Sequence, residues 1–148
     1  PWLSWHVSLI MISYGLFAFT FLNGILALCL IGKQKNTASP ITGEQIEQLT
    51  LLSRLLLYPG TFLLGIGIVL GAVWANVSWG SYWSWDPKEV WALAAFIIYG
   101  ISFHRNSLPC FQRQWLFHGY MIFAFAVVLM TYFGVNHLLG GMHSYANS

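Results

Sequence analysis

Charged side chains are scarce in this sequence of 148 residues. It contains six Lys and Arg and four Asp and Glu, so 7% of its residues are charged and 57% are hydrophobic. About a quarter of the residues of a soluble domain are charged. This deficit excludes a water-soluble globular domain and predicts an integral membrane protein that contacts membrane lipid. The net charge of +2 is also too small to indicate a nucleic-acid partner.

Cysteine is equally rare, since Cys29 and Cys110 are the two that the chain contains. They are far apart and form no CxxC or zinc-like spacing, which argues against a structural disulfide, a zinc site or a redox motif. An initiator Met is also missing, because the chain opens on Pro1. We therefore expect it to be part of a longer protein.

Long uncharged apolar segments dominate what the sequence does contain. A transmembrane helix needs about 20 such residues. The predicted fold is therefore all-α and polytopic, with about four transmembrane helices at 6–31, 60–77, 87–104 and 115–135. A short amphipathic helix at the membrane interface is expected over 43–57, where apolar residues recur at helical spacing, and Pro59-Gly60 would mark the bend after it. Three glycines of the second span predict close contacts between helices: Gly65, Gly67 and Gly71.

The few basic residues predict how the chain crosses the membrane. With four spans, one face receives Lys33, Lys35, Arg54, Arg105 and Arg113. The opposite face receives Lys88. Cytoplasmic loops carry an excess of Lys and Arg, so the first face is predicted to be cytoplasmic. The segment 78–91, His6 and the tail 136–148 then share the extracytoplasmic side.

Four tryptophans lie in the segment 78–91: Trp79, Trp83, Trp85 and Trp91. Asp86 is predicted to cap a helix that begins at Pro87, with Glu89 completing a capping box. The aromatic residues before Asp86 therefore lie on a loop. They could be interfacial belt residues, or they could form a platform on which a large flat ligand stacks. The chemistry alone leaves both interpretations open.

Histidine supplies the candidate metal ligands. His6 and His143 are predicted on the same outer side as the tryptophans, which suits the two axial nitrogens of a six-coordinate haem, although each alone could be a structural hydrogen-bonding residue. His104 is expected at the inner end of the third span, about 26 Å from Asp86. It is either an interfacial residue or a contact for a second, inner haem. His118 is expected to be packed or interfacial, and His137 could replace His143 as a ligand.

Three motifs in this order resemble one family. They are Trp5-His-Val-Ser8, Trp79-Gly-Ser-Tyr-Trp-Ser-Trp-Asp-Pro-Lys-Glu89, and Tyr132-Phe-Gly-Val-Asn136 with Gly141-Met-His-Ser-Tyr145. The central motif resembles the WWD signature of haem-handling proteins, and its Asp-Pro-Lys-Glu ending is similar to the CcsA (ResC) branch of System II cytochrome c biogenesis. Together the motifs cover most of the chain.

The resemblance implies that haem b is held at the outer face and attached there to the CXXCH cysteines of apocytochrome c. It implies that His6 and His143 are the outer haem ligands and that His104 is one of two transmembrane histidines. The expected partner of His104 has no match in this chain. A CcsB/ResB-type partner, fused or separate, and a bacterial cytoplasmic or thylakoid membrane are implied as well.

The sequence thus predicts the core of a cytochrome c synthase of the haem lyase type. In it Trp79, Trp83, Trp85 and Trp91 hold the porphyrin, His6 and His143 bind its iron, Asp86 and Glu89 shape the loop, and Lys88 is the cation near the propionates. No side chain is predicted to act as a dedicated acid or base. The alternatives are a b-type electron-transfer cytochrome, which would bury histidine pairs within its spans, and a transporter or structural subunit that uses the aromatics as an interfacial clamp.

Overall fold

The computed structural model describes residues 2–37, 39–104 and 107–133. They form four α-helices and a short 3-10 helix: α1 (Trp2–Asn36), α2 (Pro40–Trp79), α3 (Pro87–Ile101), η1 (Pro109–Gln112) and α4 (Gln114–Leu129). These described residues contain no strand. The all-α prediction is therefore confirmed for them.

Three helical segments are long and apolar enough to cross a membrane: α1, α2 and Gln114–Phe133, in which a π-helical turn extends α4. Such lengths and compositions are those of an integral membrane protein. The span predicted at 87–104 is present as α3, but its fifteen residues rise only about 22 Å. Because the hydrocarbon core is about 30 Å thick, the fourth crossing stays a prediction.

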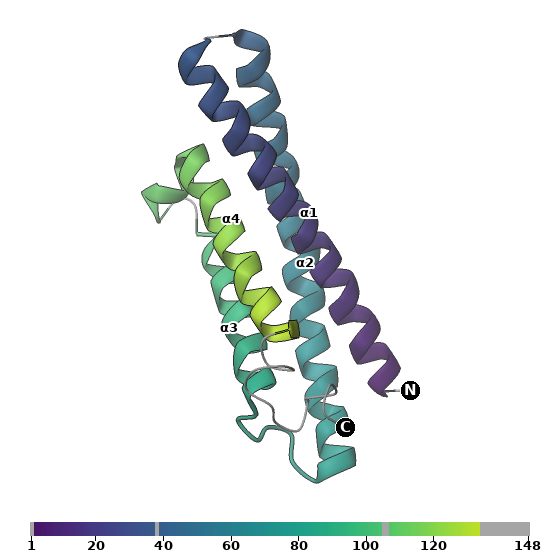
Figure 1. The fold of residues 1–148 in the computed structure, drawn as a ribbon. Coiled ribbons are helices and arrows are strands. Elements are labelled where there is room, and N and C mark those ends of the chain that lie inside the picture. The colour runs from purple at the N-terminus through teal and green to yellow at the C-terminus, as the bar shows by residue number, and fades with distance from the viewer. Residues whose placement is uncertain (1, 38, 105–106, 134–148) are drawn as a thin grey trace.

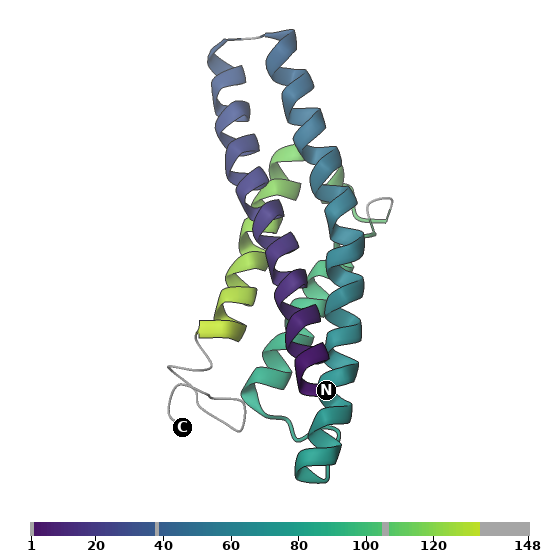
Figure 2. The same cartoon turned by 90° about the vertical axis from the view of Figure 1, so that its right-hand side faces the viewer.

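The helices are arranged as a long antiparallel hairpin of α1 and α2 with the shorter α3 and α4 beside it (Figures 1 and 2). α4 packs against α1 and α3, and α3 packs against α2. The loop 80–86 lies at the same end of the molecule as the start of α1 and the end of α4 (Figure 1). At the opposite end, the α1–α2 hairpin extends beyond the other two helices.

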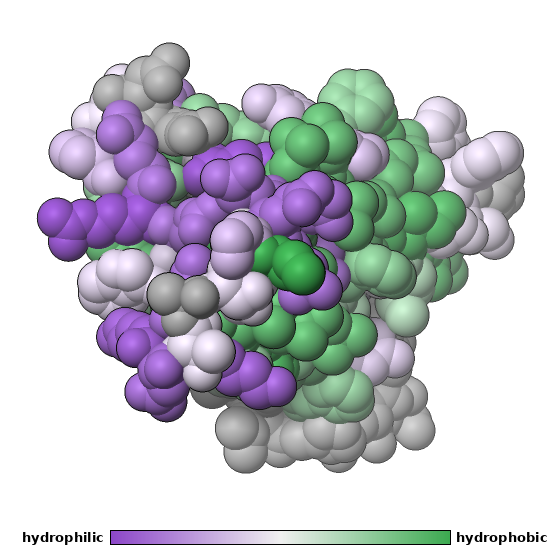
Figure 3. All heavy atoms as spheres, turned by 90° about the horizontal axis from the view of Figure 1, so that it is seen from above, coloured by the Kyte–Doolittle hydropathy of each residue, from purple (hydrophilic) through white to green (hydrophobic). Residues whose placement is uncertain are grey.

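That opposite end of the molecule is polar. Lys33 and Lys35 lie in the last turn of α1, and hydrophilic side chains gather over this end when it is viewed from above (Figure 3). Arg54 of α2 donates a hydrogen bond from Nη2 to the carbonyl oxygen of Phe111 in η1, at 2.6 Å. These basic residues therefore lie away from Lys88 and the loop, as the sequence predicts, whereas Arg105 is outside the described residues.

The core between the helices is built from aromatic and aliphatic side chains. Phe17 of α1 stacks on Tyr99 of α3 with ring centroids 3.7 Å apart, and both side chains are fully buried. Phe117 and Met121 of α4 are buried in the same cluster. This cluster contains residues of all four α-helices and fixes how α3 and α4 lie against the hairpin.

The predicted interfacial helix at 43–57 with a bend at Pro59-Gly60 is wrong, because α2 runs without interruption through both. A proline inside a helix removes one backbone hydrogen bond, but α1 packs directly across this point. Ser13 donates its hydroxyl to the Gly60 carbonyl oxygen at 2.7 Å, and the Phe17 ring occupies the space that a Cβ on Gly60 would need. The apolar residues of 43–57 are only partly covered, since Ile46 and Leu57 are buried while Leu52 and Leu55 remain exposed.

The predicted close contacts at the glycines of α2 are confirmed. A Cβ added to Gly67 would lie 2.5 Å from Ile10 Cδ1, and one added to Gly71 would lie 2.6 Å from His6 Cε1. On another face of α2, a Cβ on Gly65 would lie 3.0 Å from the Phe96 ring of α3. Bare backbone at these positions is what lets α1 and α3 approach α2.

Candidate functional site

The loop 80–86 is held by its two ends. At the end of α2, Gly80 adopts φ 79° and its N–H donates to the Asn76 carbonyl oxygen. At the start of α3, the predicted capping box of Asp86 and Glu89 is confirmed. The Asp86 carboxylate accepts from the Lys88 N–H at 3.3 Å, and the Glu89 carboxylate accepts from the Asp86 N–H at 3.2 Å. Both carboxylates therefore bond backbone N–H groups, which fixes the backbone where the loop ends and α3 begins.

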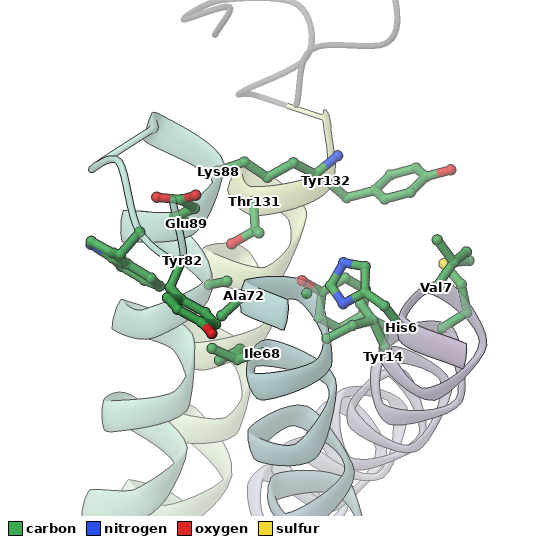
Figure 4. Close-up of a pocket in the computed structure, with 15 residues that line it drawn as sticks. His6, Val7, Tyr14, Ile68, Ala72, Tyr82, Lys88, Glu89, Thr131 and Tyr132 are labelled. Atoms are coloured by element: carbon green, nitrogen blue, oxygen red, sulfur yellow. The ribbon is translucent and has the colours of Figure 1, made fainter. Parts of the chain in front are cut away.

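A mainly apolar cavity of about 510 Å³ lies at this loop end, between α1, α2, the start of α3 and the π-helical turn after α4 (Figure 4). Its volume is in the range of cofactor and small-molecule pockets. α1 lines it with His6, Ile10 and Tyr14, which are four residues apart and so share one helix face. The cavity can therefore take one large apolar ligand against the side of α1.

The His6 ring lines this cavity, and an imidazole is a side chain that could hold a metal. It is half-buried, and its Nδ1 lies 2.6 Å from the Gly67 carbonyl oxygen. A carbonyl oxygen can only accept, so Nδ1 carries the hydrogen and the lone pair is on Nε2. An imidazole whose other N–H is held by a carbonyl is the usual arrangement of a metal-binding histidine. In this tautomer, Nε2 is the ring nitrogen that could coordinate a metal.

Polar groups gather at one edge of the cavity, where Lys88, Glu89, Thr131 and Tyr132 line it. The Lys88 ammonium lies 5.6 Å from the centre of the Tyr132 ring. Lys88 is in the first turn of α3, outside the three long apolar helices. This edge can receive the acidic groups of a ligand whose remaining surface is apolar.

The four tryptophans of the predicted platform are placed differently from one another. Trp83 lines the cavity together with Tyr82, and Trp85 meets Trp83 edge-on at 5.8 Å while remaining 72% exposed. Trp79 meets Trp74 of α2 edge-on at 4.8 Å. Trp91 packs against the core. Only Trp83 of these four is therefore among the cavity-lining residues.

The remaining histidine predictions fall at other places in the chain. His104 follows the end of α3 and is exposed, so α3 separates it from the cavity by about the 22 Å rise of that helix. It cannot bind the same metal as His6. His143, predicted as the second ligand, and His137, its alternative, both lie outside the described residues.

His118 is fully buried within α4, as predicted for a packed residue. Thr50 donates its single hydroxyl hydrogen to the Ile46 carbonyl oxygen at 2.8 Å, so at 2.8 Å from His118 Nε2 its oxygen accepts. The His118 Nε2–H therefore donates to Thr50 of α2. His118 joins two helices and lies in the core, away from the cavity.

Several cavity residues were not predicted from the sequence, among them Ile10, Tyr14 and Thr131. The signal for the first two was available, because they follow His6 at intervals of four residues and so extend its helix face. Thr131 directly precedes the motif that begins at Tyr132. Its cavity position depends on the packing of α4, which no local pattern predicts.

Residues 1–143 match the family described as cytochrome C assembly protein. Protein NrfI of Wolinella succinogenes is 41% identical over 98% of this chain and 16% of its own length. The cytochrome c biogenesis proteins CcsA of Chlamydomonas reinhardtii and of Prochlorococcus marinus strain MIT 9515 are 40% and 34% identical over 97% of this chain, which corresponds to 40% and 53% of their own lengths. The chain thus spans between a sixth and about half of these relatives.

Proposed function

Because this chain belongs to the cytochrome c assembly protein family, we propose that it binds haem b in the cavity at the loop end and presents it to apocytochrome c for covalent attachment. The observation that carries the proposal is the His6 ring, which lines an apolar cavity with Nδ1 bonded to the Gly67 carbonyl oxygen. An axial haem ligand needs a fixed imidazole of this kind.

The walls of the cavity support a porphyrin as the ligand. Apolar side chains such as Ile10 and Ile68 suit its faces, and Tyr82 and Trp83 offer aromatic rings for stacking. Lys88 is the proposed partner of the propionates. We assign direct contact to Trp83, and assign Trp79, Trp85 and Trp91 to holding the loop and the start of α3, with Asp86 capping that helix.

The second axial ligand in this proposal is His143. It lies ten residues beyond Phe133, the last described residue, and ten extended residues span up to about 33 Å. Tyr132, just before that point, lines the cavity. Chain length therefore allows either His143 or His137 to reach the face of a porphyrin opposite His6.

The proposed activity is that of a cytochrome c synthase core which works by positioning. The haem vinyl groups supply the reactive bonds, and each takes a cysteine sulfur on one carbon and a hydrogen on the other. Thiolates are the reactive form of those cysteines. The chain would hold haem and the CXXCH segment together, which makes the encounter effectively unimolecular. A CcsB/ResB-type protein is the proposed partner.

His104 is proposed to contact a second haem, nearer the cytoplasmic side. Its exposed position at the far end of α3 supports a site separate from the cavity. In this proposal the loop 80–86 faces the extracytoplasmic side of a bacterial or thylakoid membrane, because the basic residues gather at the hairpin end, and α3 supplies the fourth crossing.

The b-type electron-transfer alternative would use histidines buried within the helices. His118 is the buried histidine of the described residues, and its Nε2–H bonds Thr50. A haem ligand at that position would have to break this bond and open the core. The position of His118 therefore gives the alternative no support.

The test is the absorbance spectrum of the protein purified in mild detergent. The wild type should carry a Soret band of six-coordinate haem, and His6→Ala should lose most of it. Gly15→Ala is the control, because nothing lies within 4 Å of a Cβ added at that position of α1, and it should leave that spectrum in place. Equal spectra for wild type and His6→Ala would contradict the proposal.

A further inference from the structure

We propose that Gly67 and Gly71 of α2 are positioning residues that set the tautomer and place of the His6 ring. The inference rests on the proposed function, in which His6 binds the haem iron. The two glycines lie four residues apart, so they form one notch on the face of α2 that meets α1. Their role is to hold the His6 ring in place, Gly67 through its carbonyl oxygen and Gly71 by leaving room for the ring.

Gly67 contributes its carbonyl oxygen, 2.6 Å from His6 Nδ1. The oxygen of a helical residue normally accepts from the N–H four positions on, and it has a second lone pair that can accept here as well. This second bond holds the hydrogen on Nδ1 and so puts the lone pair on Nε2, the proposed ligand atom. The approach is possible because Gly67 has no side chain: a Cβ there would lie 2.5 Å from Ile10 Cδ1 and 2.8 Å from its Cγ1.

Gly71 contributes empty space. An added Cβ would lie 2.6 Å from His6 Cε1, 2.7 Å from Nδ1 and 3.2 Å from Nε2. Contacts below 3.0 Å to two atoms of a rigid ring, with a third atom at 3.2 Å, cannot be relieved by a small rotation, so the ring would have to leave the notch. The bond to the Gly67 carbonyl oxygen would then lengthen or break.

The local sequence supports a specific role for these glycines. Glycine is the poorest helix former after proline, yet α2 keeps Gly67 and Gly71 in its interior. A Cβ on Gly67 would clash with Ile10 of the cavity wall, and a Cβ on Gly71 would clash with the His6 ring itself. Both therefore act where α1 presents His6.

The first test needs no haem. In protein labelled with ¹⁵N-histidine, the His6 signal, identified by its loss in His6→Gln, should report hydrogen on Nδ1 in the wild type. Gly71→Ala should shift this signal toward the mixture of tautomers seen for an exposed histidine. The matched control is Gly15→Ala, since Gly15 lies in α1 with nothing within 4 Å of an added Cβ; it should keep the wild-type signal. An unchanged tautomer in Gly71→Ala, or hydrogen on Nε2 in the wild type, would overturn the proposal.

The second test uses the haem-loaded protein. Gly71→Ala should retain about tenfold less six-coordinate haem than Gly15→Ala, the lower end of the effect of losing an outer-shell partner. Added imidazole should restore the six-coordinate spectrum, because it can replace a displaced ligand. If Gly71→Ala has the spectrum and midpoint potential of the wild type, the proposed role of the two glycines in positioning His6 is contradicted. If the wild type binds no haem while the tautomer result holds, the proposed function fails and the positioning of His6 stands.

Discussion

The hydrogen bond between Thr50 and His118 gives a quantitative prediction about the core. Thr50→Val removes the hydroxyl that accepts the Nε2–H of a fully buried imidazole and keeps the side-chain shape close to the original. Leaving a buried donor without its acceptor costs about 1–3 kcal/mol, and the unfolding free energy should fall by that amount. Double-mutant cycles on hydrogen bonds between membrane helices give coupling energies that average about 0.6 kcal/mol and reach about 1.7 kcal/mol. The coupling between the two residues should therefore lie in this lower range.

The assay is a double-mutant cycle in detergent, with Thr50→Val, His118→Phe and the double variant unfolded by SDS and followed by circular dichroism. Thr20→Val is the matched control, because the Thr20 hydroxyl is also buried but bonds the Phe17 carbonyl oxygen of its own helix. It should show no coupling with His118→Phe. A Thr50–His118 coupling within the roughly 0.3–0.5 kcal/mol seen for independent sites would refute the reasoning.

Two further predictions use the same unfolding measurement. Asp86→Ala should destabilise the protein by about 0.5–2 kcal/mol through loss of the helix cap, whereas Asp86→Asn keeps a capping acceptor and should stay close to wild type; equal losses in both variants would mean that the cap is unimportant. Gly60→Ala should cost about 1–3 kcal/mol by overpacking, because the new Cβ would lie 2.8 Å from the Phe17 ring. Gly15→Ala is its control, because nothing lies within 4 Å of a Cβ added there. Similar losses of unfolding free energy in Gly60→Ala and Gly15→Ala would rule out the tight contact at Gly60.

The sequence predicted local features well. The capping box needed only Asp86, Pro87 and Glu89 in the right order, and the structure confirms it, because a capping box is made by neighbouring residues. The apolar runs likewise predicted the helices. The positions of Ile10 and Tyr14 on the same helix face as His6 could also have been predicted, because they follow it at helical spacing.

Features that depend on distant contacts were not predictable in this way. Pro59 indicates a bend when only its neighbours are considered, yet the contacts of Ser13 and Phe17 with Gly60 lie more than forty residues away in the chain. Trp83 and Trp85 lie on the loop 80–86, where helix periodicity does not apply, and Trp85 adopts φ 58°. Which of them faces the cavity is therefore decided by backbone turns that spacing cannot reveal.

The uninterrupted course of α2 has a consequence for how the molecule sits in its membrane. Forty residues make a rod of about 60 Å, and even at an extreme tilt of about 40° a 30 Å hydrocarbon layer would enclose only about 39 Å of it. A stretch of about 20 Å must therefore stand clear of the acyl chains. Polar side chains gather at the hairpin end, with Lys33 and Lys35 in the last turn of α1, so we expect this overhang on the side away from the cavity.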